Sequence, residues 1–274
     1  MMNTKTGQPA KPPSPSVDRA LSILHTLADQ PDGMGVSELS RALHEAKSSL
    51  HAVLLTMELR GFLHKDPLTK RYKLGPQLLV IGAAYSRHTN LLSAFQAVAA
   101  QLVQRCGETV QLAMLHGRHI LYIGKHEGTH QVRLAAQVGG QLPAHATALG
   151  KALLSGLDDA AIATLFEGVA LEQLTSQTIG RLDELRRALA EVRAQGYAFD
   201  HGETNAELRC VAAPVYDVSG VISAAISVSV PITRMDAQRE AELAELIRAH
   251  AQDLSRRLGY AGSAEDRRRE GLAA

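Results

Sequence analysis

Apolar residues in the first quarter of the chain recur at three- and four-residue spacing, a period typical of helices with one buried face. The first such stretch covers residues 17–28, with Ser16 as its expected cap, and it ends at Pro31-Asp32-Gly33. A second, shorter stretch follows Ser37, which we expect to cap it, and a third begins near Lys47. The pattern therefore predicts three successive helices.

A short alternating pattern follows the third helix, which Gly61 ends. Residues 62–65 and 71–74 alternate around Asp66-Pro67-Leu68-Thr69, which is typical of a two-stranded hairpin. Helices followed by a hairpin that carries Lys and Arg are the elements of a winged helix-turn-helix. In that motif one helix enters the DNA major groove and the hairpin contacts phosphates. Residues 16–75 are therefore predicted to bind DNA.

Gly75-Pro76 interrupts the pattern, and two helices with apolar stripes are expected over residues 77–86 and 91–105. We interpret residues 76–90 as a helical linker. It carries more apolar side chains than a solvated connector needs, so we expect it also to contact a second copy of the chain. These side chains are Leu78, Leu79, Ile81 and Tyr85.

From Thr109 onward the pattern indicates strands interspersed with helices. Helices flanking one mostly antiparallel sheet give an α+β fold over residues 91–260, with a hollow face suited to a small ligand. The expected strands are residues 109–116, 119–126, 131–138, 197–200, 209–216 and 221–230. The expected helices are residues 147–155, 158–166, 181–195 and 236–258, the last with a buried stripe of Leu243, Leu246, Ile247 and Leu254.

Charge is distributed unevenly, although the formal net charge of the 274 residues is only +1. Residues 1–90 contain 11 Lys and Arg against 7 Asp and Glu, and the remainder contains 18 against 21. The basic excess lies where phosphates have to be neutralised. The more neutral remainder must serve a second function, which we take to be sensing.

The composition argues against a secreted or membrane protein. Cys106 and Cys210 lie far apart and form no CxxC pair, so neither a disulfide framework nor a zinc cluster is expected. The sequence contains no run of 18 apolar residues. Residues 1–15 are Pro-rich without an apolar core, and residues 261–274 are polar, so both are expected to be flexible tails. We predict a cytoplasmic protein without a cofactor, a metal or a membrane partner.

Two groups of side chains are expected to contact DNA. The first turn of a reading helix presents short polar groups and a cation to base edges, and the third helix begins with Lys47, Ser48, Ser49 and His51. The hairpin supplies cations for phosphates, namely Lys65, Lys70, Arg71 and Lys73. Taken singly, each residue is equally consistent with a solvated charge or a helix cap. It is the order of the elements that favours DNA binding.

Several segments resemble the IclR family of bacterial transcriptional regulators. In the first domain they are SVDRALSILHTLAD (16–29), the Lys-Ser-Ser helix start, Arg-Gly-Phe-Leu and Tyr-Lys-Leu-Gly. In the second they are LPAHATALGKALLS (142–155) and GYAFDHGETNAELRCVAAPVYD (196–217). The resemblance covers about residues 16–259 with the motifs in the expected order, which is more specific than a helix-turn-helix alone.

The resemblance implies a GAF/profilin-like sensor domain that binds a small organic acid or a related metabolite. It also implies a homodimer, or a dimer of dimers, on palindromic double-stranded operator DNA. No enzymatic activity is expected, and a repressor is favoured over an activator. The alternative from another class is a small-molecule enzyme or carrier with a vestigial helix-turn-helix. Salt-dependent affinity for DNA distinguishes the two, because only the regulator requires it.

Four polar residues fall where members of the family hold a carboxylate-bearing effector: Asp200, Cys210, Ser227 and Ser229. For the two serines the alternation gives independent support, because they share one face of a strand that is otherwise Ala, Ile and Val. Buried hydroxyls need partners, which a ligand or water supplies. The alternative is that the serines bond the neighbouring backbone and that Cys210 is ordinary core.

Further contacts are implied by the resemblance. Residues 139–150 would form a lid that leads into a helix, whose N-terminal amides can hold an anion. Ala148 and Leu149 would face the effector, and Gln131 and Leu134 would line the far wall. This chain departs from the family pattern at Ala52, Gln131, Glu207 and Val230, where arginine, an apolar side chain and, twice, glycine are usual. We therefore expect a different operator sequence and an effector with an additional polar group.

Three patterns resemble catalytic or metal-binding chemistry and are rejected. Gly150-Lys151-Ala152 lacks the Ser or Thr of a phosphate loop, and His145 stands where the first glycine must be. The twelve histidines come without HExxH, CxxC or dense carboxylates, so no metal site is predicted. Asp200-His201 with Cys210 lacks the helix N-terminus or oxyanion loop that a cysteine hydrolase needs.

Overall fold

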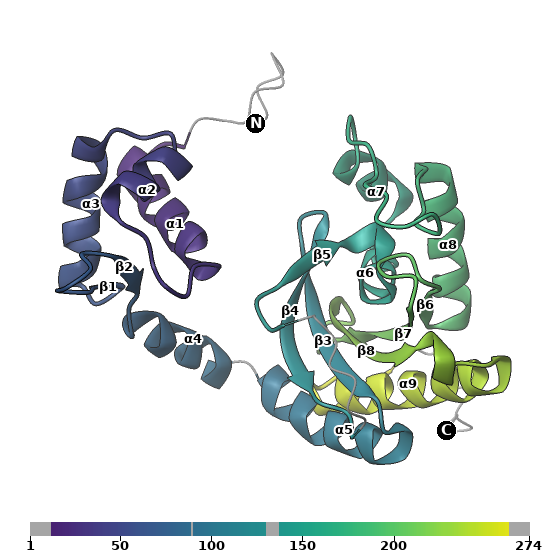
Figure 1. Ribbon diagram of the computed structural model, residues 1–274. Helices are drawn as coiled ribbons and strands as arrows, with labels where there is room; N and C mark the ends of the chain where they lie inside the picture. Colours follow the sequence, from purple (N-terminus) through teal and green to yellow (C-terminus); the bar gives the residue numbers. More distant parts are fainter. Residues whose placement is uncertain (1–11, 89, 130–136, 263–274) are drawn as a thin grey trace. The chain divides into compact units, whose positions relative to one another are not determined.

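The structure is a computed structural model, and it describes residues 12–88, 90–129 and 137–262. The chain divides into two compact units, Met1–His88 and Thr89–Ala274. The first contains the winged helix-turn-helix and the linker helix, and the second contains a sheet with its covering helices (Figure 1). Within the described residues no helix is long and apolar enough to cross a membrane.

Helices and a hairpin build the first unit in the predicted order. Its elements are α1 (Pro15–Ala28), α2 (Val36–Ala42), α3 (Lys47–Leu59), β1 (Leu63–Lys65), β2 (Tyr72–Leu74) and α4 (Gln77–His88). β1 and β2 pair antiparallel, with Leu63 opposite Leu74. The core is made of Ile23, Leu27, Leu39, Leu50, Leu54, Met57, Leu63 and Tyr72. In the first helix the apolar spacing predicted this face only in part, because Val17 and Leu21 are exposed and Ile23 is buried instead.

The starts of the first two helices differ from the prediction. Ser14 occupies the cap position of α1 and Pro15 the first turn, so Ser16 lies inside the helix. Proline suits that position because its φ is already helical and no N–H is needed there. α2 follows Gly35, whose N–H is bound by Glu38 Oε2 at 2.8 Å. The carboxylate of Glu38 therefore caps this end, and Ser37 does not.

The linker helix α4 exposes an apolar surface, as the sequence predicts. Leu79, Val80 and Ile81 are 77%, 54% and 50% exposed, whereas Leu78 is half-buried. The side chain of Tyr85 lies outside the described residues. Three adjacent apolar side chains in solvent are more than a connector needs.

A six-stranded sheet organises the second unit, in the order β5-β4-β3-β8-β7-β6. Each neighbouring pair is antiparallel. The α+β fold is confirmed, and β3 and β4 have the predicted bounds. The strands are β3 (Thr109–His116), β4 (His119–His126), β5 (Gln141–Pro143), β6 (Ala198–Asp200), β7 (Leu208–Tyr216) and β8 (Ile222–Pro231).

Helices cover both faces of this sheet (Figure 1). One face carries α5 (Asn90–Cys106) and α9 (Ala237–Arg257), and the other carries α6 (Ala148–Leu154), α7 (Asp159–Leu165) and α8 (Leu182–Gln195). Alternation along β7 and β8 sends Val211 and Val228 to the α5–α9 core and Ala212 and Ala225 to the α6 core. We call the second side the α6 face. Polar residues in phase with Ala212 lie on it.

The strand predicted over residues 131–138 is not found where it falls on described residues. Residues 130–136 lie outside the described part of the chain, and residues 137–138 are not in a strand. Gly139, with φ of 90°, helps turn the chain back onto β4, where Tyr122 bonds the backbone of Gly139 and Gly140 at 2.8 and 3.0 Å. The edge strand β5 follows this turn. The expected lid over residues 139–150 therefore contains β5, a short 3-10 helix (Ala144–Ala146) and the start of α6.

Candidate DNA-binding surface and effector site

The first turn of α3 is open to solvent. Lys47, Ser48 and His51 are exposed, and Ser49 is half-buried. The helix starts after Ala46, which offers no side-chain cap, so no side chain in the described structure caps its first N–H groups. Ala52, which departs from the family pattern, is also exposed. This turn presents hydroxyls, an imidazole, a cation and backbone donors to an anionic partner.

The tip of the hairpin, or wing, is folded by Asp66. Its Oδ1 accepts the N–H groups of Leu68 and Thr69, both at 2.8 Å, and these bonds lower the pKa of Asp66 below its ordinary value. Lys70 has φ of 57°, in the left-handed region, and completes the reversal toward β2. Lys70 is exposed as a result, and Leu68 is 90% exposed.

Arg71 is engaged within the first unit. Its guanidinium donates to Gly33 O at 3.1 and 2.8 Å and pairs with Glu38 Oε2 at 2.9 Å. Lys65 is also partly engaged, with its ammonium 5.0 Å from the centre of the Tyr72 ring. Lys73 is half-buried. Of the four wing cations predicted to contact phosphates, Lys70 is exposed, and Arg71 already has protein partners.

The sheet brings the four predicted polar residues onto the α6 face. Asp200, Cys210 and Ser229 lie opposite one another on β6, β7 and β8, and Ser227 follows on the same face of β8. Cys210 Sγ donates to Ser229 Oγ at 3.3 Å, and Ser229 Oγ donates to Gln111 Oε1 at 2.9 Å. Sequence reasoning missed Gln111. The available signal was a polar amide at an inward-facing position within the apolar run of residues 110–115.

The thiol and the phenol of this face keep their protons. Burial, with the charge of Asp200 as a second cause, raises the pKa of Cys210 to about 12. Burial also raises the pKa of Tyr122, again with Cys210 and Asp200 nearby. Both groups are therefore neutral hydrogen-bonding groups at neutral pH. Because the thiolate is the nucleophile, this environment suits binding rather than cysteine chemistry.

Asp200 uses its carboxylate inside the protein. Oδ1 accepts the N–H groups of Gly202 and Glu203 at 3.0 and 2.6 Å, and Oδ2 accepts the hydroxyl of Thr204 at 2.7 Å. A direct contact with an effector, as predicted, has to compete with these three bonds. The loop that they shape places Glu203 against Lys151 of α6 as a buried ion pair. Sequence reasoning missed this pair, because its members are 52 residues apart.

Two buried oxygens of this region have no hydrogen-bond partner among the described residues, Ser227 Oγ and Glu203 Oε2. Ser227 is 1% exposed and Glu203 6%. Buried polar atoms are nearly always paired, with protein, water or a ligand. A small polar molecule bound here would supply the hydrogen-bond partners that these two oxygens lack.

The start of α6 is packed tightly beside this region. Ala148 and Leu149, both predicted to face the effector, are buried. Thr147 caps the helix by accepting the N–H of Gly150 at 2.8 Å. A side chain at Gly150 would meet Ala144 O at 2.0 Å, so only glycine fits between α6 and the 3-10 helix. The predicted wall residues, Gln131 and Leu134, lie outside the described residues.

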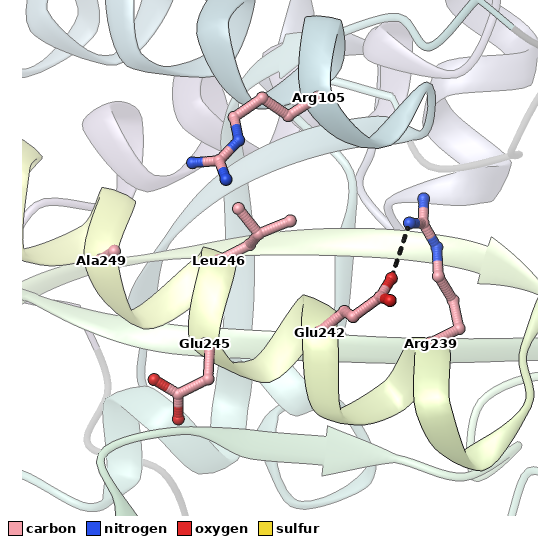
Figure 2. Close-up of a pocket in the computed structure, with 6 residues that line it drawn as sticks. All are labelled: Arg105, Arg239, Glu242, Glu245, Leu246 and Ala249. Carbon is pink, nitrogen blue, oxygen red and sulfur yellow. Dashed lines mark hydrogen bonds and ion pairs between the residues drawn. The ribbon is translucent and has the colours of Figure 1, made fainter.

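A separate groove of about 540 Å³ lies along α5 and α9, on the other side of the sheet (Figure 2). Both of its carboxylates are paired, Glu242 with Arg239 at 3.3 Å and Glu245 with the neighbouring Arg248 at 2.6 Å. The groove is lined by Arg105, Arg239, Glu242, Glu245, Leu246 and Ala249. None of the predicted effector residues that the structure describes lines it.

A winged helix-turn-helix joined to an effector-binding α+β unit defines a ligand-responsive DNA-binding transcriptional regulator. Residues 16–67 match the family model of the IclR helix-turn-helix domain, and residues 83–256 match that of the bacterial transcriptional regulator IclR C-terminal domain. The chain belongs to the IclR family. This membership supports the regulator over the enzyme or carrier alternative.

Relatives share most of the chain. It is 34% identical over 245 residues to the HTH-type transcriptional regulator XynR of Escherichia coli (strain K12), covering 89% of this chain and 97% of the relative. It is 33% identical to the HTH-type transcriptional repressor AllR of Klebsiella pneumoniae, with 91% and 92% covered. The crystal structure of an IclR transcriptional regulator from Alicyclobacillus acidocaldarius matches with a TM-score of 0.79 and 27% identity, with 90% and 99% covered.

Proposed function

We propose that this protein is a repressor whose affinity for operator DNA is set by a small acid bound on the α6 face. The observation that carries the proposal is the exposed, uncapped first turn of α3 in the same unit as the exposed Lys70. Lys47 and Lys70 each neutralise a phosphate, while Ser48, Ser49 and His51 contact base edges or the backbone. Lys65 and Lys73 add to the basic field of the wing.

The proposed effector site is supported by the polar residues that the alternation of the strands places on one face of the sheet. Cys210, Ser229 and Gln111 form a chain of hydrogen bonds there. Ser227 Oγ is buried, and among the described residues it lacks a partner. Ala148 and Leu149 supply apolar contact from α6. A few fixed polar groups within apolar surroundings are typical of a site for a small metabolite.

The direction of control follows the named relatives. AllR of Klebsiella pneumoniae and the transcriptional repressor IclR of Escherichia coli (strain K12), 33% and 30% identical to this chain, are both named repressors. A repressor blocks transcription while it occupies its operator. The metabolite would therefore act by changing how strongly the protein holds DNA in the cytoplasm.

Two copies of the chain, or two pairs, are proposed to occupy a palindromic operator. Each copy contributes one reading helix, and two-fold symmetry places two such helices on two half-sites. The apolar side chains of Leu79, Val80 and Ile81 give each copy a surface to share. Burying it between copies removes that surface from water.

The experiment is a binding titration of the full chain on duplexes from the DNA beside its gene, by fluorescence anisotropy at several salt concentrations. The logarithm of affinity should fall linearly with that of salt, by about 0.9 for each phosphate contact. The double variant Lys47→Ala/Lys70→Ala is the comparison and should have the shallower slope. Affinity that is indifferent to salt would exclude the proposed DNA contact.

A further inference from the structure

Stability alone does not explain why Lys151 and Glu203 form a buried ion pair. The two side chains are only 5% and 7% exposed. Moving charges out of water is expensive, and a buried pair often stabilises a fold no better than apolar side chains of the same volume. Perturbed charges of this kind gather at functional sites. Glu203 Oε2, a member of the pair, and Ser227 Oγ on the same face of the sheet are also buried without a hydrogen-bond partner among the described residues.

Glu203 is held by its backbone on both sides. Its N–H is bound by Asp200 Oδ1 at 2.6 Å, and its carbonyl accepts the hydroxyl of Thr178, also at 2.6 Å. The hydroxyl of Thr175 fixes the preceding carbonyl, that of Gly202, at 2.7 Å. Moving the residue away from Lys151 means breaking these bonds. Glu203 can therefore respond to a ligand more easily by changing its ion-pair partner or its protonation state than by moving.

The charges around Glu203 do not balance. Burial raises the pKa of Glu203, the nearby ammonium of Lys151 lowers this pKa, and the nearby carboxylate of Asp200 raises it. The site therefore contains one ammonium and two carboxylates. The neighbouring groups add little. Cys210 and Tyr122 keep their protons, burial lowers the pKa of His145, and the guanidinium of Arg209 donates to backbone carbonyls. An incoming carboxylate is therefore repelled unless a proton enters with it.

We propose that Lys151 is the counter-ion for the acid group of the effector, and that Glu203 takes up one proton from water as that group binds. The proposal rests on the proposed function of the α6 face. In the free protein the ammonium pairs with ionised Glu203. On binding, the ammonium of Lys151 pairs with the effector carboxylate instead of Glu203. The proton taken up from water neutralises Glu203, so the net charge of the buried groups is unchanged. Glu203 then becomes a donor, and the hydroxyl of Ser227 is left for a further polar group of the effector.

Proton uptake gives this exchange a measurable signature. When one proton enters with each ligand, the dissociation constant rises about tenfold for each unit of pH. A neutral amide of the same shape brings no charge and shows no such dependence. Comparison of acids with their amides therefore tests the charge exchange itself.

The experiment uses the full chain with acetate, lactate, benzoate and 4-hydroxybenzoate, each beside its primary amide. Thermal unfolding identifies the acids that bind. Calorimetric titration of the best acid, in two buffers of different ionisation enthalpy, then counts the protons. We expect stabilisation by at least one acid in preference to its amide, with about one proton taken up per acid bound.

Three variants accompany the titration. Glu203→Gln keeps the size of the side chain but cannot take up a proton, so acid binding should become independent of pH. Lys151→Met/Glu203→Gln removes both charges together and should fold without binding acids. It avoids leaving one buried charge without its charged partner, as either single change would. Glu207→Gln changes an exposed carboxylate four residues from Glu203 and should behave as the unchanged protein.

Acid binding without proton uptake, or acid binding that survives in the double variant, overturns the proposal. Binding of amides alone, or of no compound, overturns it as well. Binding of amides alone leaves the proposed function standing, because the protein still responds to a small molecule. Salt-dependent binding to DNA is measured separately and tests the proposed function whatever the outcome here.

Discussion

The charges of the two candidate sites differ in their exposure to water. In the first unit Lys47 and Lys70 are exposed, and even the pair of Arg71 and Glu38 is 36% and 37% exposed. In the second unit Lys151 and Glu203 are almost wholly buried. DNA presents many phosphates, so cations that remain in water are sufficient to bind it. A metabolite brings one or two charges, and a single charge has a large effect only where water is largely excluded.

The largest effect should come from Glu203→Ala. This change leaves the ammonium of Lys151 buried without its partner, and we expect the second unit to lose about 3–5 kcal/mol of unfolding free energy. Urea unfolding of the full chain measures the loss. Glu38→Ala in the exposed pair of the first unit is the matched change and should have a much smaller effect. Equal losses would mean that burial does not distinguish the two pairs.

Gly150→Ala should follow, at about 1–3 kcal/mol, because the added carbon overpacks the contact between α6 and the 3-10 helix. Its position would be 2.0 Å from Ala144 O. Gly82→Ala in α4 is the counterpart in the first unit, where no atom lies within 4 Å of the added carbon. There the higher helix propensity of alanine should stabilise by up to about 1 kcal/mol. Thermal unfolding of the two variants should show a loss of stability for Gly150→Ala and a gain for Gly82→Ala.

Ser229→Ala removes the hydroxyl that connects Cys210 and Gln111 by two hydrogen bonds. One lost hydrogen bond corresponds to about 0.5–1.5 kcal/mol, or roughly a two- to tenfold weaker effector affinity. The affinity for DNA should be unchanged. Calorimetry with the binding acid and anisotropy with DNA measure the two properties, and Ser219→Ala in the β7–β8 turn serves as control. A full effector response in the Ser229 variant would show that the site is misassigned.

The wing allows a finer comparison within the first unit. Lys70→Ala should reduce the salt slope of DNA binding by about 0.9, since one phosphate contact is lost. Arg71→Ala should leave the slope nearly unchanged and instead lower the thermal stability of the first unit, because its partners are Gly33 and Glu38. A slope that falls equally in both variants would identify Arg71 as a phosphate contact.

The smallest effect concerns pH. The N–H of Gly35 and the charge of Arg71 lower the pKa of Glu38, so its contribution to stability is complete above the ordinary value of 4.5 and is lost as pH falls. Burial raises the pKa of Glu203, so its ionisation costs stability as pH rises from 4.5. Unfolding followed separately in each unit, by amide signals in NMR spectra, should show these opposite slopes. Glu203→Gln should remove the second slope alone.

Local patterns predicted the elements whose neighbours are close in sequence. β3 and β4 have the expected bounds because alternation and the Gly117-Arg118 turn act within a few residues. The start of α3 at Lys47 was predicted from spacing as well. The edge strand β5 was not, because it is three residues long and is stabilised by pairing with β4. Short strands of this kind depend on a partner that the local sequence does not specify.

The same limit applies to the candidate site. Period-two alternation predicted that Ser227 and Ser229 share a face, and the family pattern supplied Cys210 and Asp200. Gln111 and the pair of Lys151 and Glu203 were missed, because their contacts join residues 118 and 52 positions apart. Arg71 has the appearance of a phosphate ligand in the sequence, and its internal partners become visible only when the hairpin is folded against Gly33.

Arg71 has a consequence for how repression can be relieved. Its ion pair with Glu38 joins the wing to α2, and Leu39 and Leu50 share the core between α2 and α3, so the three elements pack as one unit, which we call the reading head. In the proposed dimer, we therefore expect a bound metabolite to alter the separation of two intact reading heads and to leave individual base contacts unchanged. Chemical footprints taken with and without the metabolite should show the same protected bases in every half-site, differing only in occupancy.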